Sequence, residues 1–481
     1  MSNLQDYRKF YINGQWVNPA HPNDFNVIDP STEKSIAIIS IGGDADTEAA
    51  VNAAKVAFPT WSTTTPEERL RYVEKILTIY ERRAPDMAHA ITQEMGAPQD
   101  MSLSDQVGCG VAHIQAFIDT FKKFKFIRPI SAEDTDTMIA WEPVGVIAAI
   151  TPWNWPMNQI TLKVIPALLA GNTVILKPSE IAPLSAIVWT EILDEAGLPK
   201  GVFNMLHGDG VGVGTQLSSH PDVSMISFTG STRAGIAITK TAADTVKKVV
   251  LELGGKGANL VFADADKAGI EATLQYCFLN SGQSCNAPTR LLVECSCYDE
   301  IVELAANIAR QTEVATAHQS GAHIGPVISK LQWDKIQNLI EVGINEGARL
   351  VVGGTGLPDG LTEGYFVKPT VFADVNNNMR IAREEIFGPV LSIIPFDTEE
   401  EAVAIANDTI YGLTNYVQTS DINRKRRLAR QLQAGMIEIN GNNLPAGSAF
   451  GGVKASGRAR EGGIWGLEEF MDSKFISGWS E

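Results

Sequence analysis

The chain has 481 residues, of which 44% are hydrophobic and 20% are charged; these values are typical of a globular protein with two or three domains and exclude disordered, collagen-like and disulfide-rich classes. Lys and Arg number 39 against 56 Asp and Glu, so the net charge of −17 would repel nucleic-acid phosphates, and we expect no nucleic-acid partner. The sequence has no apolar signal segment at its start and no run of about 18 apolar residues, so we expect a cytoplasmic protein without a membrane partner.

Residues 1–120 are predicted to be largely helical. The segment Thr65-Pro-Glu-Glu68 has the pattern of a helix start, because Thr can cap the first turn, Pro suits the first helical position and Glu completes a capping box. The apolar residues that follow at helical spacing are Leu70, Val73, Ile76, Leu77 and Tyr80.

From residue 144, short apolar runs alternate with amphipathic stretches, and Gly or Pro stands between them. Nearly continuous apolar strands joined by helices predict a parallel sheet covered on both faces, which is a doubly wound, Rossmann-like α/β domain. Such a sheet binds its ligand at the carboxyl ends of the strands. The predicted strands are 146–150, 173–177, 202–206, 225–229 and 249–253, and the predicted helices lie near 158–170, 183–196, 211–219 and 231–243.

A second alternating block begins at Asn259 and predicts a second α/β domain, with strands at 289–294, 390–396 and 436–440. Two segments fit neither block: residues 121–143 and the tail after about Gly457. Each could be an arm that pairs with an edge strand of another subunit.

Three glycine-rich segments were tested against nucleotide-binding patterns. Residues 208–214 have the spacing GxGxGxG, which does not match GxGxxG, and residues 452–457 have the gap of a P-loop but lack the Lys and Ser or Thr that must follow. Phe228-Thr-Gly-Ser231 ends a predicted strand and opens a helix, where free backbone N–H groups can hold an anion. An ordinary strand-to-helix turn explains this segment equally well.

Five further residues could carry chemistry. Lys177 and Glu180 follow a predicted strand and could bind a ribose, although a solvated charged turn is the alternative. Cys285 lies between a helix and a strand, and a lone cysteine is more often a small buried residue than a nucleophile. Glu252 ends a strand and is a possible base. Asn154 lies in a rigid loop between prolines and indoles and could donate to an oxyanion, or simply belong to a packed aromatic turn.

Together these segments form one ordered set. Over essentially its full length the chain resembles the NAD(P)-dependent aldehyde dehydrogenase superfamily. The matching segments are Pro152-Trp-Asn-Trp-Pro156, Lys177-Pro-Ser-Glu180, Phe228-Thr-Gly-Ser231, Glu252-Leu-Gly-Gly-Lys256, Gly282-Gln-Ser-Cys285, Glu384-Glu-Ile-Phe-Gly-Pro389 and Phe450-Gly-Gly452.

The resemblance implies a reaction and a site. Cys285 would be the nucleophile and Glu252 the general base, while Asn154 and the backbone N–H of Cys285 would form the oxyanion hole. An aldehyde would be oxidised to its carboxylic acid through a thiohemiacetal and a thioester on the cysteine, and water would hydrolyse the thioester. The implied cofactor-binding residues are Trp153, Lys177, Ser179, Glu180, Gly230, Ser231, Glu385 and Phe387.

The resemblance also implies three parts of the chain: a cofactor domain (1–120 and 144–252), a catalytic domain (253–451) and a small oligomerisation arm (121–143 and 452–481) of a homodimer or homotetramer. Glu180 favours NAD because a carboxylate repels a 2′-phosphate, although Ser179 leaves NADP possible. No metal is expected, because a neutral aldehyde needs none for this route and the five cysteines form no ligand cluster with His.

The substrate pocket implied by similarity is mostly apolar. Its residues are Trp155, Gln159, Leu162, Leu279, Leu444 and Phe450. This set suits a medium aliphatic or aromatic aldehyde better than a small anionic semialdehyde. A semialdehyde remains open as a third substrate class. Two other functions also stay open: a CoA-acylating relative, which the presence of Glu252 disfavours, and a structural or binding role without catalysis, which would not require the complete set.

Overall fold

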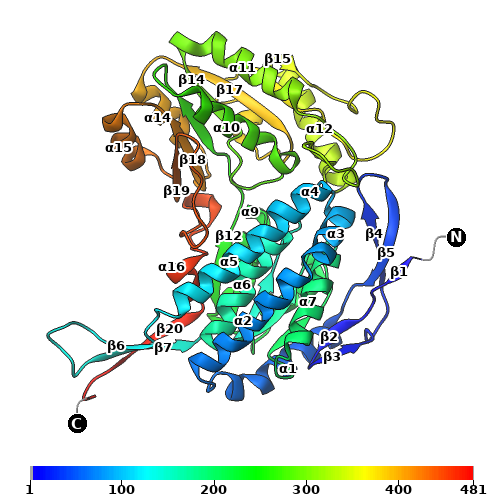
Figure 1. The fold of residues 1–481 in the computed structure, drawn as a ribbon, viewed down its shortest axis with the longest axis vertical. Helices are drawn as coiled ribbons and strands as arrows, with labels where there is room; N and C mark the ends of the chain where they lie inside the picture. The colour runs from blue at the N-terminus through cyan, green and yellow to red at the C-terminus, as the bar shows by residue number, and fades with distance from the viewer. Residues whose placement is uncertain (1–3, 480–481) are drawn as a thin grey trace.

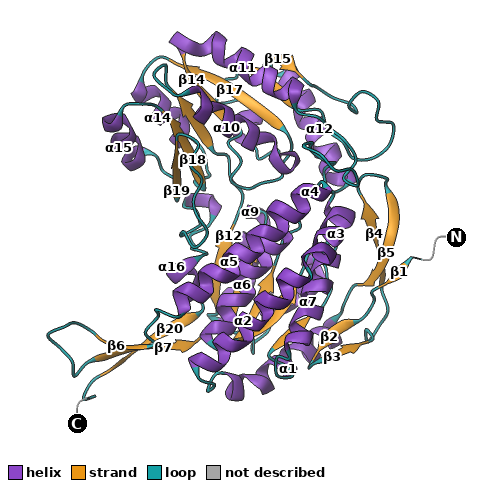
Figure 2. Cartoon of the chain, viewed as in Figure 1, coloured by secondary structure: helices purple, strands orange, loops and turns teal. Residues whose placement is uncertain are grey.

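The computed structural model describes residues 4–479 as four β-sheets with helices packed around them (Figure 1). Two sheets have seven strands each and two have three. Figure 2 shows the two large sheets in separate layers, one in the lower half of the view and one in the upper half. The mixed α/β fold predicted from the sequence is therefore confirmed, with two large α/β units and a small antiparallel sheet.

The first large sheet has the strand order β12-β11-β8-β9-β10-β2-β3, and its strands from β8 to β12 run parallel. The chain moves outward from β8 through β9 and β10 and then returns to the other side of β8 with β11. Ligands of doubly wound sheets bind where the strand order reverses in this way. The strands are β2 (Phe10–Ile12), β3 (Gln15–Val17), β8 (Val146–Ile150), β9 (Thr173–Lys177), β10 (Phe203–Met205), β11 (Met225–Thr229) and β12 (Lys248–Glu252).

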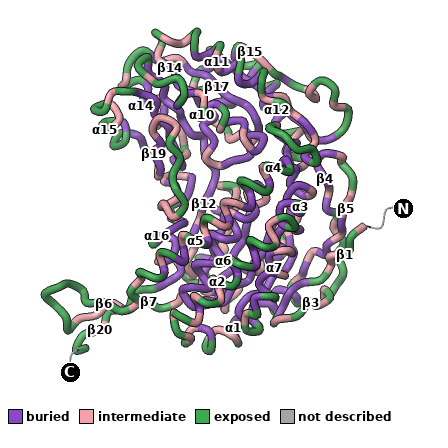
Figure 3. The backbone as a smooth tube through the Cα atoms, viewed as in Figure 1, coloured by how far each residue is buried: buried purple, intermediate pink, exposed green. Residues whose placement is uncertain are grey.

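Helix α6 (Pro156–Ala170) lies at the centre of this unit, and Asn158 is its one residue that is not buried. It packs between the sheet and the outer helices, and Figure 3 shows this interior as buried. Its position fixes the loop that precedes it, residues 151–155, at the carboxyl end of β8. The other helices of the unit are α1 (Asp44–Trp61), α2 (Pro66–Arg82), α3 (Ala84–Met95), α4 (Gln99–Met101), α5 (Gly108–Phe121), α7 (Leu184–Ala196), α8 (Thr215–Ser219) and α9 (Thr232–Ala242).

The second large sheet has the order β15-β16-β17-β14-β13-β18-β19 and is parallel except between β15 and β16. Its strands are β13 (Ala258–Val261), β14 (Arg290–Glu294), β15 (Arg349–Val352), β16 (Thr370–Ala373), β17 (Val390–Phe396), β18 (Thr414–Gln418) and β19 (Met436–Ile439). Its helices are α10 (Lys267–Phe278), α11 (Tyr298–Gln311), α12 (Lys330–Asn345), α13 (Arg380–Arg383), α14 (Glu399–Asn407) and α15 (Ile422–Gln431).

A three-stranded antiparallel sheet projects from the body at the lower left of Figure 1. It contains β6 (Ile127–Pro129), β7 (Met138–Pro143) and β20 (Met471–Ile476), in the order β20-β7-β6, and the short helix α16 (Gly463–Glu468) leads into β20. The two segments that fitted neither predicted domain therefore pair with each other. The predicted domain boundaries themselves stay a prediction.

The sequence predicted the parallel strands well. The strands at 146–150, 173–177 and 225–229 are confirmed residue for residue, and those at 202–206 and 249–253 differ by one residue at each end. The helix predicted near 211–219 begins as a π-helical turn, Gly210–Gly214. Thr65 caps α2 as expected, since its hydroxyl accepts from the backbone N–H of Glu68 at 3.2 Å.

The prediction that residues 1–120 are largely helical was wrong for the first 40 residues. They form five strands, of which β1 (Gln5–Asp6), β4 (Asp24–Asp29) and β5 (Lys34–Ser40) make a separate sheet. Strands β1, β2 and β3 have two or three residues each, and β2 and β3 are joined by a turn at Asn13 and Gly14, both with positive φ. Their apolar pattern is too brief to show the two-residue period of a strand. Strands β4 and β5 are longer, but their pairing shifts register between Val27 and Ile28.

Candidate active site

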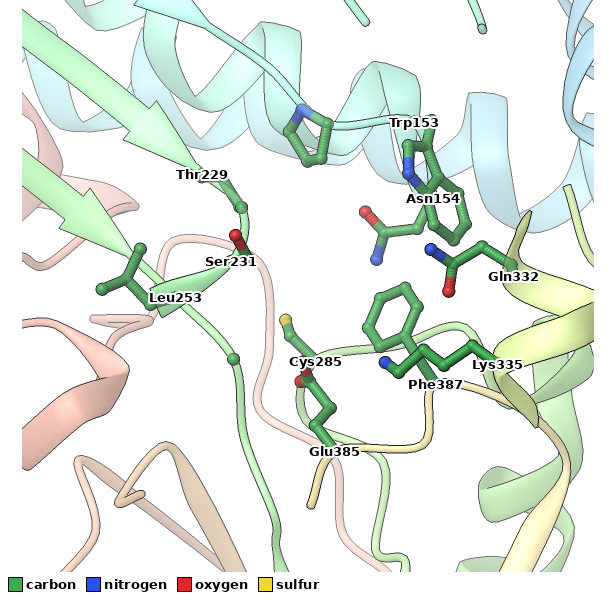
Figure 4. Close-up of a pocket in the computed structure, with 13 residues that line it drawn as sticks. Trp153, Asn154, Thr229, Ser231, Leu253, Cys285, Gln332, Lys335, Glu385 and Phe387 are labelled. Carbon is green, nitrogen blue, oxygen red and sulfur yellow. The ribbon is translucent and has the colours of Figure 1, made fainter. Parts of the chain in front are cut away.

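A cavity of about 160 Å³ lies where the two large sheets meet, at the reversal of strand order beside β8 (Figure 4). One wall comes from the segments that follow β8, β11 and β12, and the other comes from α12 and the loops before β14 and β17. The predicted site residues that line it are Trp153, Asn154, Gly230, Ser231, Cys285, Glu385 and Phe387. Residues far apart in the sequence are thus brought together, as the motif set predicted.

Cys285 is partly exposed, and Figure 4 shows its sulfur facing the cavity. The loop before it contains three successive residues with positive φ: Asn280 (54°), Ser281 (57°) and Gly282 (70°). A side chain on Gly282 would also meet the carbonyl of Gly388, so only glycine fits there. Burial raises the pKa of the Cys285 thiol well above its usual value, and the neighbouring carboxylates raise it further. The thiol is therefore protonated at neutral pH in this arrangement.

The Asn154 side chain is tied to the nucleophile loop. Its Nδ2 donates to the backbone carbonyl of Gln283 at 3.0 Å, and the next residue, Trp155, donates its indole N–H to the hydroxyl of Ser284 at 2.8 Å. A primary amide has two N–H groups in one plane, so engaging one of them fixes the direction of the other. The second N–H of Asn154 remains to interact with an oxygen in the cavity.

Glu252 ends β12 and is 2% exposed, but it is not among the residues that line the cavity. Neither of its carboxylate oxygens has a hydrogen-bond partner among residues 4–479. Burial raises its pKa well above the usual value and the nearby Glu461 raises it further, while Lys163 opposes the shift. Lys163 and Glu461 form a buried ion pair at 2.6 Å. Glu252 is therefore a desolvated carboxyl group one residue away from the cavity wall.

Glu385 and Phe387 face Trp153 and Asn154 across the cavity. A carboxylate oxygen of Glu385 accepts a hydrogen bond from the backbone N–H of Gly255 at 2.8 Å. The rings of Phe387 and Trp153 pack edge to face, with their centroids 5.3 Å apart. Phe387 also has a positive φ of 62°. Non-glycine residues in this conformation are strained and concentrate at functional sites.

Two residues of this wall were not predicted from the sequence. Gln332 and Lys335 project from the first turns of α12 into the cavity, as Figure 4 shows. No motif surrounds them, and an amide and a lysine on an amphipathic helix look like ordinary surface residues. Their spacing of three residues, which places them on one helical face, was the one available signal.

The predicted ribose-binding residues lie at the end of β9, outside this cavity. Lys177 is buried, and its ammonium donates to the carbonyl of Pro178 at 2.8 Å and to that of Gly208, with Glu180 at 3.6 Å. Burial lowers the pKa of Lys177, and Glu180 opposes that shift. Ser179 is almost fully buried beside them. The three residues form one charged group at the carboxyl edge of the sheet.

The six predicted substrate residues do not line the Cys285 cavity. Leu162 is buried in α6, and Gln159 accepts from Lys163 at 3.4 Å. Leu279 borders two surface hollows beside α10, and Leu444 is 40% exposed on a loop. The remaining two are partly exposed: Trp155, which bonds Ser284, and Phe450, whose backbone pairs with Glu461.

One further residue of α6 lies on the face that the predicted substrate residues share. Asn158 is three residues after Trp155 and four before Leu162, so these side chains follow one stripe of the helix. Its side-chain oxygen is 2.7 Å from Nε2 of His113. The sequence analysis passed over Asn158 because it belongs to none of the motifs.

Residues 4–479 contain neither a cluster of metal ligands nor a helix that could span a membrane. No group of three or more His, Cys, Asp or Glu side chains in this range could hold a metal ion. No helix within the same range is long and apolar enough to cross a membrane.

Comparison with known proteins identifies the family. Residues 16–476 match the profile of the aldehyde dehydrogenase family. A 3-succinoylsemialdehyde-pyridine dehydrogenase from Pseudomonas sp. is 46% identical over 478 residues, which cover 99% of each chain. An aldehyde dehydrogenase from Bartonella henselae is 60% identical, with a TM-score of 0.98 over 99% of this chain and 100% of that one.

Two related structures contain the cofactor. A variant of aldehyde dehydrogenase C from Pseudomonas syringae, in complex with NAD+ and octanal, is 43% identical, with a TM-score of 0.96 over 98% of this chain and 97% of that one. Betaine aldehyde dehydrogenase from Staphylococcus aureus, in complex with NAD+, is 36% identical, with a TM-score of 0.94 over 98% of this chain and 95% of that one. The chain therefore belongs to the aldehyde dehydrogenase family and is an NAD(P)-dependent aldehyde dehydrogenase.

Proposed function

We propose that this dehydrogenase oxidises an uncharged aliphatic or aromatic aldehyde of medium length, with NAD as its cofactor and Cys285 as its nucleophile. The observation that carries the proposal is the meeting of a cysteine sulfur, an oriented amide and the carboxyl ends of a reversed parallel sheet in one cavity. The sheet supports binding of a dinucleotide, and the cysteine and amide support attack on a carbonyl.

The proposed reaction proceeds in two covalent stages. The Cys285 thiol gives its proton to water or to a neighbouring carboxylate, and its sulfur attacks the aldehyde carbon. The resulting oxyanion accepts hydrogen bonds from Asn154 Nδ2 and from the backbone N–H of Cys285. NAD+, when bound, accepts the hydride that leaves this carbon, and a thioester remains on Cys285. Glu252 then removes a proton from water, which attacks the thioester and releases the carboxylic acid and the thiol.

The residues fit a dinucleotide on structural grounds. Ser231 caps α9 by accepting from the backbone N–H of Ala234 at 3.3 Å, and the N-terminus of this helix, with Gly230 before it, suits a pyrophosphate. Glu385 offers a carboxylate oxygen for the nicotinamide ribose, and Phe387 with Trp153 would hold the ring. Lys177, Ser179 and Glu180 would hold the adenine ribose at the end of β9.

We expect Glu180→Ala to raise the KM for NAD more than the KM for NADP. The carboxylate would accept hydrogen bonds from the ribose hydroxyls. It also lies 3.6 Å from the ammonium of Lys177 and balances its charge, which would otherwise attract a 2′-phosphate. The ratio of kcat/KM for NADP to that for NAD is the measurement. Glu180→Gln is the control, because it keeps a hydrogen-bond acceptor while removing the charge. Its ratio should lie between that of the wild type and that of Glu180→Ala. An unchanged ratio in Glu180→Ala would place Glu180 away from the ribose.

The substrate class follows from the side chains on the proposed approach to Cys285. Of the six predicted pocket residues, five are leucines or aromatic residues and none is Arg or Lys. Burying a CH₂ group contributes about 0.8 kcal/mol, so such a lining favours a longer apolar aldehyde. Complexes of the Pseudomonas syringae relative with octanal agree with this preference.

A panel of aldehydes tests the substrate class. With NAD we expect kcat/KM to rise from propanal to octanal and to be high for benzaldehyde, and to be lowest for succinic semialdehyde, whose carboxylate would meet no Arg or Lys among the six predicted pocket residues. A semialdehyde that reacts faster than octanal would overturn the class. Measuring NADH release with and without CoA separates hydrolysis from acyl transfer.

We also propose a cytoplasmic homodimer or homotetramer that assembles through the projecting sheet. All five cysteines are unpaired, which suits a reducing compartment. Apolar side chains are exposed on the projecting strands and just beyond them, including Phe475 (63%), Trp479 (50%) and Ile127 (47%). Such edges and side chains are normally covered by a partner.

Deleting residues 466–481 is expected to lower the molar mass in light scattering or to leave the protein insoluble, because β20 is lost and the edge of β7 is exposed. Phe475→Asp is a milder variant that retains the strand and should weaken the same contact, with Lys474→Asp as the neighbouring control. If both the deletion and Phe475→Asp keep the wild-type molar mass, assembly does not depend on this sheet.

A further inference from the structure

We propose that Gln106, a residue outside every motif discussed above, is a positioning residue that holds the Asn154 amide in register with the Cys285 loop. The inference deepens the proposed function, because it assumes that Asn154 contributes to the oxyanion hole. It rests on a set of buried amide hydrogen bonds that joins three distant segments of the chain.

Gln106 lies in a π-helical segment, Ser102–Val107, between α4 and α5. A π turn inserts an extra residue into a helix, changes which side chains face inward and is frequent at functional sites. The Tyr80 hydroxyl donates a hydrogen bond to the backbone carbonyl of Val107 at 3.1 Å. Gln106 is fully buried, so the turn directs an amide into the interior rather than toward solvent.

The Gln106 amide donates to two groups. Its Nε2 is 3.1 Å from the backbone carbonyl of Asn154 and 3.3 Å from the side-chain oxygen of Asn280. Asn280 in turn donates its Nδ2 to the carbonyl of Asn154 at 2.9 Å and to that of Gln283 at 3.3 Å. Gln106 thus touches both the loop after β8 and the loop that leads to Cys285.

These bonds form a closed ring. The Asn154 carbonyl accepts from Asn280, Asn280 donates to the Gln283 carbonyl, and that carbonyl accepts from the Asn154 side chain at 3.0 Å. Gln283 lies two positions before Cys285 in the sequence, so the ring sets the direction of the free Asn154 N–H relative to the sulfur. Gln106 holds the ring from outside and also restrains Asn280, which has a positive φ of 54°. Networks of buried amides strengthen one another and lose order together.

The Gln106 side-chain oxygen has no hydrogen-bond partner within the described range 4–479. A buried acceptor without a partner is costly, so packing alone would favour an apolar residue of this size. The amide is explained by its two donated bonds. Its contribution is therefore to alignment at the site rather than to the packing of the helix.

The experiment uses the full-length enzyme with NAD and octanal. Gln106→Met retains the side-chain volume but removes both hydrogen-bond donors. We expect the rate of the first NADH turnover to fall about 10–100-fold. This loss is smaller than that expected for Asn154→Ala itself, which is about 10²–10³-fold. The control is Gln115→Met, the same substitution at an exposed amide of α5 that donates to Asp119 at 2.9 Å, which should change no rate. The Kd for NAD should remain within about twofold in both variants.

Two readouts separate positioning from general disruption. Alkylation of Cys285 by iodoacetamide forms no oxyanion, so its rate in Gln106→Met should match that of the wild type. In an Asn154→Ala background, Gln106→Met should cause less than about a twofold further loss, because the amide that it positions is absent. Losses that multiply, or an alkylation rate that falls with the turnover rate, would overturn the inference.

Gln106→Glu provides a second variant of the same size if Gln106→Met does not fold. It places an acceptor against the Asn154 carbonyl and should show the same dependence on Asn154, and independence from Asn154 would equally overturn the inference. If the wild-type enzyme produced no NADH from octanal or any other aldehyde, the proposed function would fail. An active wild type with Gln106→Met indistinguishable from Gln115→Met would reject only the role of Gln106.

Discussion

Replacing Cys285 with alanine is expected to reduce aldehyde oxidation by at least about 10³-fold, because Cys285 supplies the one thiol among the residues that line the cavity and the proposed hydride transfer starts from its adduct with the carbonyl carbon. NAD binding should persist, since the residues proposed to hold the cofactor lie on β9, α9 and the loop before β17. NADH formation measures the first effect, and titration of the protein with NAD measures the second.

Two further variants sharpen this test. Cys285→Ser keeps a hydroxyl nucleophile of higher pKa and should be nearly as inactive as the alanine variant, which separates loss of the thiol from loss of volume. Cys295→Ala, at an exposed cysteine that does not border the cavity, should behave as the wild type. Substantial turnover in Cys285→Ala would reject the assignment of the nucleophile.

The strand-end positions of the site residues were predictable, because a run such as Val146–Ile150 is apolar at every position and the chemistry follows directly after it. Helices and strands that pack on both faces leave a strong signal in a single sequence. The N-terminal strands β1–β5 leave a weak one, because each is fixed by pairing with a neighbour rather than by a run of apolar residues. Tertiary contacts, which a local pattern does not contain, determine them.

The residues of the site also divide into those that a local pattern reveals and those that only the fold brings there. Cys285, Glu252 and Asn154 were found because they belong to motifs, whereas Lys335, Gln332 and Gln106 were not. Lys335 reaches the cavity only because α12 packs across it, and Gln106 turns inward only because its helix has a π turn. Both conditions depend on the folded arrangement of elements. The predicted substrate residues show the converse case, since similarity grouped them but the cavity that holds Cys285 is lined by others.

Glu252 connects the mechanism to pH. Its raised pKa follows from burial and from Glu461, so more of this carboxyl is protonated near neutrality than an exposed glutamate would be. A general base acts in its deprotonated form. Hydrolysis of the thioester should therefore accelerate as the pH rises through the raised pKa of Glu252, and the rising limb of the kcat profile should lie above the usual range of a glutamate.

Glu252→Gln is expected to separate acylation from hydrolysis. If Glu252 acts only on the hydrolytic water, the variant should still attack the aldehyde and release close to one NADH per active site in a rapid burst, followed by a much slower steady state. The rising limb of the pH profile should disappear with the carboxyl. Stopped-flow absorbance of NADH gives both the amplitude and the rate of the burst.

The rate of that burst distinguishes two roles for the same carboxyl. The Cys285 thiol has a raised pKa and needs a proton acceptor before attack, and Glu252 is one of the carboxylates that raise it. If Glu252 also takes the thiol proton, the burst itself should slow in Glu252→Gln while keeping its amplitude. Glu469→Gln is the control, because Glu469 also lies within electrostatic range of Glu252 but pairs with Lys248 at 3.5 Å. A variant without a burst that still turned over at the wild-type rate would exclude both roles and place the base elsewhere in the site.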